Sequence, residues 1–247
     1  MRLRHSFGSP PAKPRPKNIW MKATDIFSDI SHAQLLELRA SGVKPYLNED
    51  GTITAWTFLS PEAFQALEEN GALCCPQESV NPDFSSAYPW MIGVMTEVGL
   101  PPPSKGISPL WCWISCGTPD RKPPEDMHES GHYLVEFRIP PEQILCSMFH
   151  YWHYCMNYWP LARSVDAAER YDDFLLEKGL SYYRTKPLPT PHHEHIQASW
   201  RQIFKLDFYQ LGDKEDSLED RMIQGVFWTL NKEVITCITP IPAPQKS

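Results

Sequence analysis

The sequence predicts a single compact α+β domain, with a mixed or antiparallel sheet flanked by helices. Stretches with hydrophobic residues at helical spacing intermix with stretches of alternating hydrophobic residues, which are typical of strands. The chain shows no regular strand–helix–strand rhythm and no glycine-rich phosphate loop, so a nucleotide-binding doubly wound fold is not expected. With 42% hydrophobic residues in a chain of 247, one sizeable core can form.

The first half of the chain carries clear start and stop signals. Ser60 is a helix cap, Pro61 suits the first helical position, and Gly71 marks the end of that helix. A turn at Asp50-Gly51 precedes a loosely alternating stretch. We expect helices over 28–42, 60–71 and 85–99 and a strand over 52–59.

The second half is richer in aromatic residues. Residues 109–117 (PLWCWISCG) and 132–140 (HYLVEFRIP) predict strands. Residues 148–160 (MFHYWHYCMNYWP), 163–179 and 198–207 predict helices, and the proline-bracketed 187–195 predicts a loop. Residues 222–241 predict one or two strands with a turn at Asn231-Lys232.

Charge is unevenly distributed along the chain. The net charge is −7, yet the first 22 residues hold six cations and no acid, which leaves about −13 for the remainder. We expect a disordered basic arm (1–20), a single α+β domain (21–242) and a disordered tail (243–247). A solvated tail is one interpretation of the arm. The other is contact with RNA phosphates through its cations, which are Arg2, Arg4, Lys13, Arg15, Lys17 and Lys22.

The seven cysteines form no CxxC pair and are odd in number, so we expect mostly buried thiols. No apolar run is long enough to span a membrane, and the N-terminus lacks the apolar centre of a secretory signal. A cytoplasmic protein without membrane contact is therefore expected.

The segment 148–160 holds six aromatic residues and two histidines. His150 and His153 lie at helical spacing, but the third ligand of a metal site is missing there, and we predict no metal. His153 can instead shuttle protons near neutral pH. A packed aromatic helix with satisfied polar tips is the alternative.

Two strands carry further candidate residues. Trp111 and Trp113 are two apart on one strand, so they face the same side. They either sandwich a base, an aromatic side chain or a guanidinium, or they belong to the core. Glu136 lies mid-strand, where a carboxylate is either paired, for example with Arg138, or functional. Gln224, in an apolar strand, either donates to an oxyanion or bonds to the backbone.

The blocks AYPWMIGVM, PLWCWISCGTPDRK, VEFRIPPEQILCSMFHYWHYCMNYWPL, SWRQIFKLD and IQGVFWTLNKEVI are the sequence's most distinctive parts. Over about residues 52–238, the chain resembles a domain-of-unknown-function family of bacteria and fungi, whose fungal branch includes the arginine-containing cyclodipeptide synthases. The W-x-W strand and the WHYCMNYW block carry most of the resemblance. It implies an enzyme that joins arginine from arginyl-tRNA to an aminoacyl group from a second aminoacyl-tRNA, and releases a cyclo-Arg-Xaa diketopiperazine.

That chemistry assigns provisional roles. An aminoacyl ester is already activated, so we expect no cofactor and no metal. Glu136 is expected to bind the guanidinium or act as base, with His153 as proton shuttle and Asn157 and Gln224 as polar positioners. A covalent aminoacyl-enzyme on Ser147 or Cys146 is an alternative. The expected substrate-binding residues are Trp111, Trp113, Tyr88 and Trp152, with Asp120, Asp172 and Asp173 as reserve carboxylates.

Two other functions fit parts of the sequence. Residues 54–73 resemble the opening of the ADP-ribosyltransferase fold, but Gln224 stands where those enzymes usually carry a catalytic glutamate. A non-catalytic RNA-binding module is the third hypothesis, supported by the basic arm and the tryptophans and weakened by the acidic body.

Overall fold

The computed structural model describes residues 22–82, 86–207 and 221–243. The basic arm expected from the sequence (1–20) and all of the expected tail except Ala243 therefore lie outside the described residues. The helices are α1 (Ala23–Ile26), α2 (His32–Val43), α3 (Pro61–Asn70), α4 (Ala87–Glu97), α5 (Phe149–Met156), α6 (Val165–Glu177) and α7 (His192–Ser199), followed by the 3-10 helix η6 (Trp200–Phe204). The strands are β1 (Ile53–Leu59), β2 (Ala72–Leu73), β3 (Cys75–Pro76), β4 (Ile107–Ser108), β5 (Leu110–Cys116), β6 (Tyr133–Ile139), β7 (Leu145–Met148), β8 (Met222–Phe227), β9 (Leu230–Asn231) and β10 (Ile235–Pro240).

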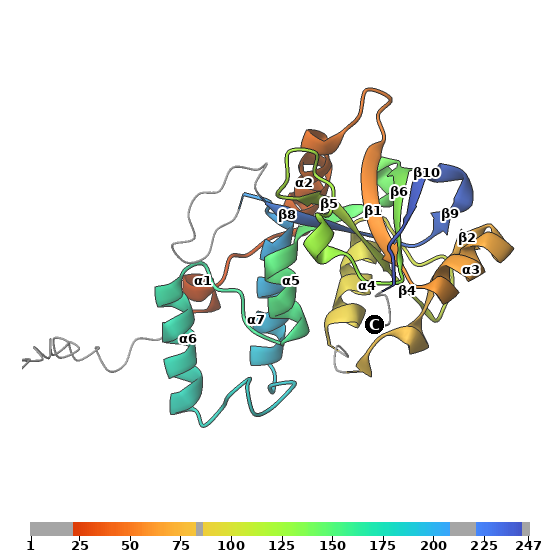
Figure 1. The fold of residues 1–247 in the computed structure, drawn as a ribbon. Coiled ribbons are helices and arrows are strands. Elements are labelled where there is room, and N and C mark those ends of the chain that lie inside the picture. The colour runs from red at the N-terminus through yellow and green to blue at the C-terminus, as the bar shows by residue number, and fades with distance from the viewer. Residues whose placement is uncertain (1–21, 83–85, 208–220, 244–247) are drawn as a thin grey trace, which may run out of the picture.

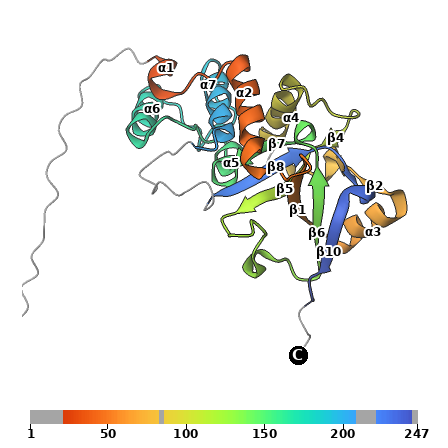
Figure 2. The same ribbon diagram turned by 90° about the horizontal axis from the view of Figure 1, so that it is seen from above.

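A six-stranded sheet forms the centre of the molecule, in the order β10-β6-β1-β5-β8-β7 (Figures 1 and 2). Every neighbouring pair in it is antiparallel. Two small two-stranded sheets, β2-β9 and β3-β4, complete the β structure of the described chain. The predicted α+β class is confirmed, and the sheet is antiparallel rather than mixed.

Alternation in β1 and β6 fixes the sheet's two faces. Ala55 pairs with Phe137, and both are buried on one face together with Ile53 and Val135. The intervening residues, among them Trp56 and Glu136, point to the opposite face because strand side chains alternate. The register is therefore specified by the apolar face.

Local signals explain most helix boundaries. The Ser60 hydroxyl caps α3, and Gly71 ends it with a left-handed φ of 71°, as predicted. α2 begins later than predicted because Ser31 and Gln34 form its capping box. The predicted loop over 187–195 is wrong from His192 onward. The segment from His192 to Ser199 contains no proline, and α7 forms there and buries Ile196.

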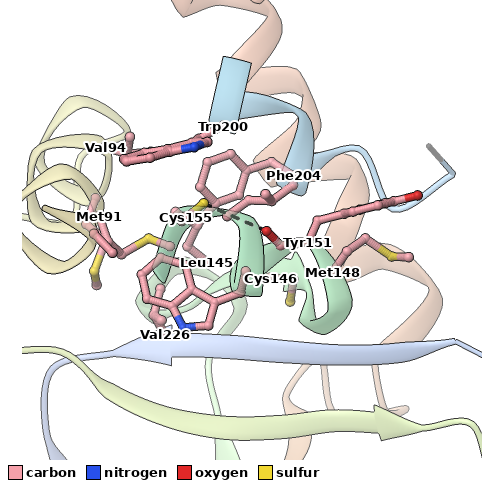
Figure 3. Close-up of a cluster of buried hydrophobic side chains, with 14 of the residues drawn as sticks. Met91, Val94, Leu145, Cys146, Met148, Tyr151, Cys155, Trp200, Phe204 and Val226 are labelled. Carbon is pink, nitrogen blue, oxygen red and sulfur yellow. Dashed lines mark hydrogen bonds between the residues drawn. The ribbon is translucent and has the colours of Figure 1, made fainter. Parts of the chain in front are cut away.

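A buried cluster connects the helices to one side of the sheet. In Figure 3, side chains of α4 (Met91, Val94), α5 (Tyr151, Cys155) and η6 (Trp200, Phe204) gather above β8, where Val226 lies. All of these are buried. The prediction of buried thiols holds for four of the cysteines, while Cys237 is exposed and Cys74 and Cys75 are half-buried; the buried four are Cys112, Cys116, Cys146 and Cys155.

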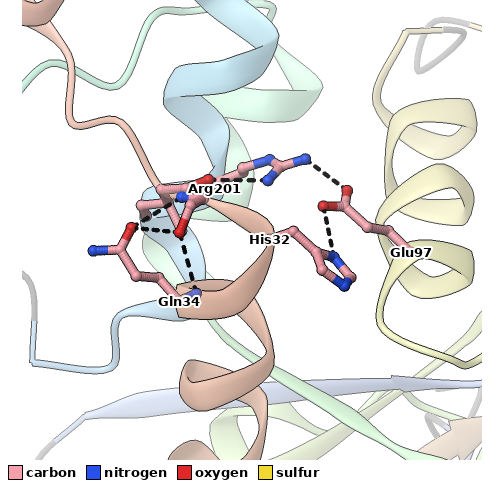
Figure 4. A network of polar contacts seen from close by, with 6 residues as sticks. His32, Gln34, Glu97 and Arg201 are labelled. Atoms are coloured by element: carbon pink, nitrogen blue, oxygen red, sulfur yellow. Dashed lines mark hydrogen bonds and ion pairs between the residues drawn. The ribbon is translucent and has the colours of Figure 1, made fainter.

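A polar network joins α2, α4 and η6 (Figure 4). Arg201 donates from Nη2 to Glu97 Oε2 at 2.6 Å and from Nη1 to the Ile30 carbonyl at 2.9 Å. His32 Nδ1 lies 3.3 Å from Glu97 Oε1. The network holds the helices in fixed relation beside the apolar cluster. In the part of the chain that the structure describes, no helix has the length and apolar character needed to span a bilayer.

Candidate functional site

Five residues from five strands form one row across the large sheet, which we call the sheet row. Trp56 of β1 pairs with Glu136 of β6 on one side and with Trp113 of β5 on the other. Trp113 pairs with Gln224 of β8, which pairs with Ser147 of β7. Directly opposed residues in antiparallel strands project to the same face, so these side chains are neighbours on one surface of the sheet.

Glu136 is held by two neutral donors. Its Oε2 accepts a hydrogen bond from Trp56 Nε1 at 3.1 Å, and its Oε1 accepts one from Thr236 Oγ1 at 2.8 Å. Thr236 reaches it because a register shift between Ile235 and Cys237 interrupts the pairing of β10 with β6. The two bonds fix the orientation of a half-buried carboxylate.

The charge of Glu136 is not balanced by a cation within the described residues. Arg138, two positions along β6 on the same face, forms its ion pair with Asp50 instead. The predicted alternative of a Glu136–Arg138 pair is therefore wrong. A carboxylate has about four acceptor positions, so Glu136 retains capacity for a further donor after its two bonds. Its geometry suits recognition of a cation.

Aromatic contacts lead from the sheet row to α5. The Trp113 ring, half-buried, lies 4.7 Å from that of Phe149, and the Phe149 ring lies 4.9 Å edge-on from His153. Partial burial, together with the neighbouring His150, lowers the pKa of His153 below its ordinary value. The lowered pKa favours the neutral form of His153, which is the form that a proton acceptor requires.

Trp111, Trp152 and Tyr88 pack against one another beside the row. The Trp111 ring is 4.5 Å from Trp152 and 6.2 Å from Tyr88, and Tyr88 is 5.9 Å from Trp152. Burial raises the pKa of the Tyr88 phenol. The three rings join β5 to α4 and α5. They therefore form a packed wall next to Trp113, and Trp111 and Trp113 do not stand free as a pair.

Gln224 and Ser147 form the buried end of the row. Gln224 is 5% exposed and Ser147 is fully buried, and the Gln224 amide donates to Ser147 Oγ at 3.2 Å. The bond is made to a side chain and not to the backbone. It links β8 to the edge strand β7, which favours a positioning role for Gln224.

The remaining predicted residues lie elsewhere. Asn157 caps α5 by donating from Nδ2 to the His153 carbonyl at 2.8 Å. Asp120 accepts from the Lys122 backbone in the turn after β5. Asp172 and Asp173 belong to α6, which lies away from β6 in Figures 1 and 2, and Asp172 accepts a hydrogen bond from the Tyr182 hydroxyl. The structure therefore does not bring the reserve carboxylates to the row.

Of the predicted RNA-binding cations, Lys22 alone falls within the described residues. It is exposed, and its backbone N–H bonds to Asp25 at the start of α1. The others, Arg2, Arg4, Lys13, Arg15 and Lys17, lie outside the described residues. Among the described side chains, no three His, Cys, Asp or Glu residues gather closely enough to hold a metal ion.

Sequence reasoning missed Trp56 and Thr236, and it considered Ser147 as a nucleophile and not as the partner of Gln224. A signal for Trp56 existed, because strict alternation from Ile53 and Ala55 places it on the face opposite the core. The neighbours of Glu136 depend on which strands lie side by side, and one sequence does not specify that order. The bulge that delivers Thr236 is equally a property of the pairing.

A comparison with protein-family models matches residues 54–236 to the family described as Domain of unknown function (DUF3841). The chain belongs to this family. No curated protein and no solved structure matches the chain. The matched span covers all five residues of the sheet row, and Thr236 is its last residue. The row is therefore part of the domain that defines the family.

Proposed function

We propose that the protein is a tRNA-dependent cyclodipeptide synthase, which joins arginine from arginyl-tRNA to a second aminoacyl group and releases a cyclo-Arg-Xaa diketopiperazine. The observation that carries the proposal is the Glu136 carboxylate, which is oriented by Trp56 and Thr236 and has no cationic partner within the described residues. The resemblance of the sequence blocks to arginine-containing cyclodipeptide synthases supports it.

Glu136 and Trp113 together suit a guanidinium. A guanidinium binds a carboxylate through two parallel charge-assisted hydrogen bonds, and it also stacks on aromatic faces. Trp56 is the direct neighbour of Glu136, whereas Trp113 lies one strand farther away. Trp56 is 4% exposed, so its ring has no free face for the cation, and its indole N–H orients Glu136 instead. The half-buried Trp113 is the residue of the row whose ring can flank the guanidinium.

The proposed reaction needs no acyl-enzyme. Burial raises the pKa of the Cys146 thiol to about 12, and Ser147 is fully buried, so neither is a suitable nucleophile. The α-amine of one aminoacyl-tRNA attacks the ester carbon of the other, and the ribose oxygen leaves. Neutral His153 accepts the proton that the attacking ammonium must lose. The free amine of the dipeptide then attacks the second ester and closes the ring.

The test is expression of the full chain in a bacterial host, with mass spectrometry of the medium for arginine-bearing diketopiperazines. We expect product from the wild type and none from Glu136→Gln, because the amide keeps the shape of the side chain but not its charge. Glu68→Gln, which removes an acid that pairs with Lys232 at the surface, is the matched control and should keep full yield.

Two outcomes would contradict the proposal. If the wild-type protein is soluble and the medium contains no diketopiperazine, the protein does not make one from the aminoacyl-tRNAs of the host. Full product yield from Glu136→Gln removes Glu136 from the site even if the activity is real. Transfer of label from NAD to RNA or protein would instead favour the ADP-ribosyltransferase hypothesis.

A further inference from the structure

A second surface lies beyond the far end of α5, and it combines exposed aromatic rings with cations. Tyr183 is 65% exposed, the highest value among the large aromatic side chains described as exposed. Its ring lies 4.5 Å from that of Tyr182 and 6.5 Å from the half-buried Trp159. A tyrosine so exposed contributes little to packing. Its ring is instead accessible for stacking with a partner that has a flat face.

The surrounding segment is basic in an otherwise acidic protein. Residues 178–193 contain Lys178, Arg184 and Lys186 and no acid, whereas the whole chain carries −7. The Arg184 guanidinium makes no ion pair or hydrogen bond with any residue that the structure describes. The neighbouring carboxylate of Asp172 is already bonded to Tyr182. A cation without a described partner that directly follows an exposed tyrosine in the chain is complementary to a phosphate that follows a base.

Contacts connect this surface to the proposed site. Lys186 Nζ donates to the Asn157 carbonyl at 2.8 Å, which joins the segment between α6 and α7 to the C-terminal end of α5 (Figure 1). At the other end of α5, Phe149 contacts Trp113. The helix rises about 1.5 Å per residue, so the two ends are roughly 12 Å apart. Exposed His153 lies on the helix between them, and exposed Asn157 caps its C-terminal end.

We propose that Tyr183, Trp159 and Arg184 bind the unpaired end of the RNA that carries the aminoacyl group. A base stacks on the Tyr183 ring while Arg184 contacts a phosphate, and the nucleotides beyond follow α5 toward His153. The inference rests on the proposed function and locates its RNA partner on the folded domain rather than on the basic arm alone. A protein partner would instead use the apolar surface nearby, where Leu176 is 73% exposed.

The experiment measures the binding of the full chain to an uncharged arginine tRNA transcript and to the same transcript without its unpaired 3′ end. For Tyr183→Ala we expect about 5- to 150-fold weaker binding of the intact transcript, the effect of losing one stacked base. Tyr183→Phe keeps the ring and should bind like the wild type. Arg184→Ala should lower the slope of log affinity against log salt by about 0.7, while Arg184→Lys leaves it unchanged.

The controls separate this inference from the proposed function. The wild type should prefer the intact transcript, and Tyr183→Ala should lose that preference. Leu176→Ala should bind RNA normally; loss of RNA binding equal to that of Tyr183→Ala would indicate a general fault in this region and overturn the assignment. If Tyr183→Ala binds the intact transcript like the wild type while the wild type makes product, the surface is wrong and the function stands. If the wild type shows the predicted binding but makes no product, the surface stands alone.

Discussion

Gly225 of β8 offers the sharpest test of how the sheet is packed. It lies between Cys112 of β5 and Cys146 of β7, in the strand that also carries Gln224. A methyl group at this position would lie 2.9 Å from Ile144 Cγ1, closer still to Ile144 Cδ1, and 3.2 Å from the Cys112 sulfur. Because Ile144 is fully buried, its side chain has no solvent-filled space to turn into.

The cost of Gly225→Ala follows from this geometry. Overpacking a dense core by one methyl group typically costs about 1–3 kcal/mol, and it outweighs the ~0.5–1 kcal/mol gained when alanine replaces glycine in a strand interior. Because the clash is with the fully buried Ile144, the upper half of the overpacking range applies, and we expect a net loss of about 1–2.5 kcal/mol in the free energy of unfolding. Urea denaturation followed by tryptophan fluorescence measures it as a lower midpoint with an unchanged slope.

A double-mutant cycle identifies the cause. Ile144→Ala alone should cost about 2–5 kcal/mol, because it leaves a cavity under β8. In the double variant the new methyl group occupies part of that cavity, so the two losses should not add and the coupling should reach about 1 kcal/mol or more. Additive losses would show that Ile144 is not the obstacle. Wild-type stability of Gly225→Ala would refute the packing argument itself.

Two further predictions concern titratable groups. Exposed Cys237 should react with iodoacetamide in the native protein, whereas Cys146 should react only after denaturation, because burial raises the pKa of Cys146 to about 12. Peptide mapping by mass spectrometry measures the labelling of both cysteines. Labelling of Cys146 in the native protein would contradict its burial. His153, whose pKa is lowered by partial burial and by His150, must be neutral to accept a proton, so product formation should fall only at an acidic pH below the ordinary titration range of histidine. His153→Gln should remove that acidic limb from a pH–rate profile measured with purified aminoacyl-tRNAs, and an unchanged limb would exclude His153 as the base.

The bounds of helices and strands were predicted well where residues close in sequence determine them. The Ser60 cap and Gly71 stop gave α3 its bounds, and alternation gave β5 and β6. The start of α7 was missed because a run of prolines up to Pro191 suggested that the loop continued. The prolines disfavour a helix only as far as the last of them, Pro191. Beyond that residue, the burial of Ile196 stabilises α7.

The candidate site was predictable one residue at a time but not as an assembly. Glu136, Trp113 and Gln224 were identified separately, each as a polar or aromatic residue in an unusual strand position. Their alignment depends on the order β6-β1-β5-β8, which joins strands from distant parts of the chain. Asp172 was predicted as a reserve substrate-binding carboxylate, because an acid on a helix is usually free to bind. In the structure, α6 lies far from β6, and the Tyr182 hydroxyl donates to the Asp172 carboxylate.

The sheet register couples the stability of the fold to the proposed chemistry. A slip of β1 by one residue against β6 would set Ala55 or Thr57 opposite Glu136, and the indole donor would be lost. The same slip would expose Ile53 and Ala55, which are both fully buried. The apolar face therefore maintains the alignment of the polar one. It follows that core substitutions on β1 that shift the register should also displace Trp56 from Glu136 and weaken the proposed binding of arginine, although none of those side chains points toward Glu136.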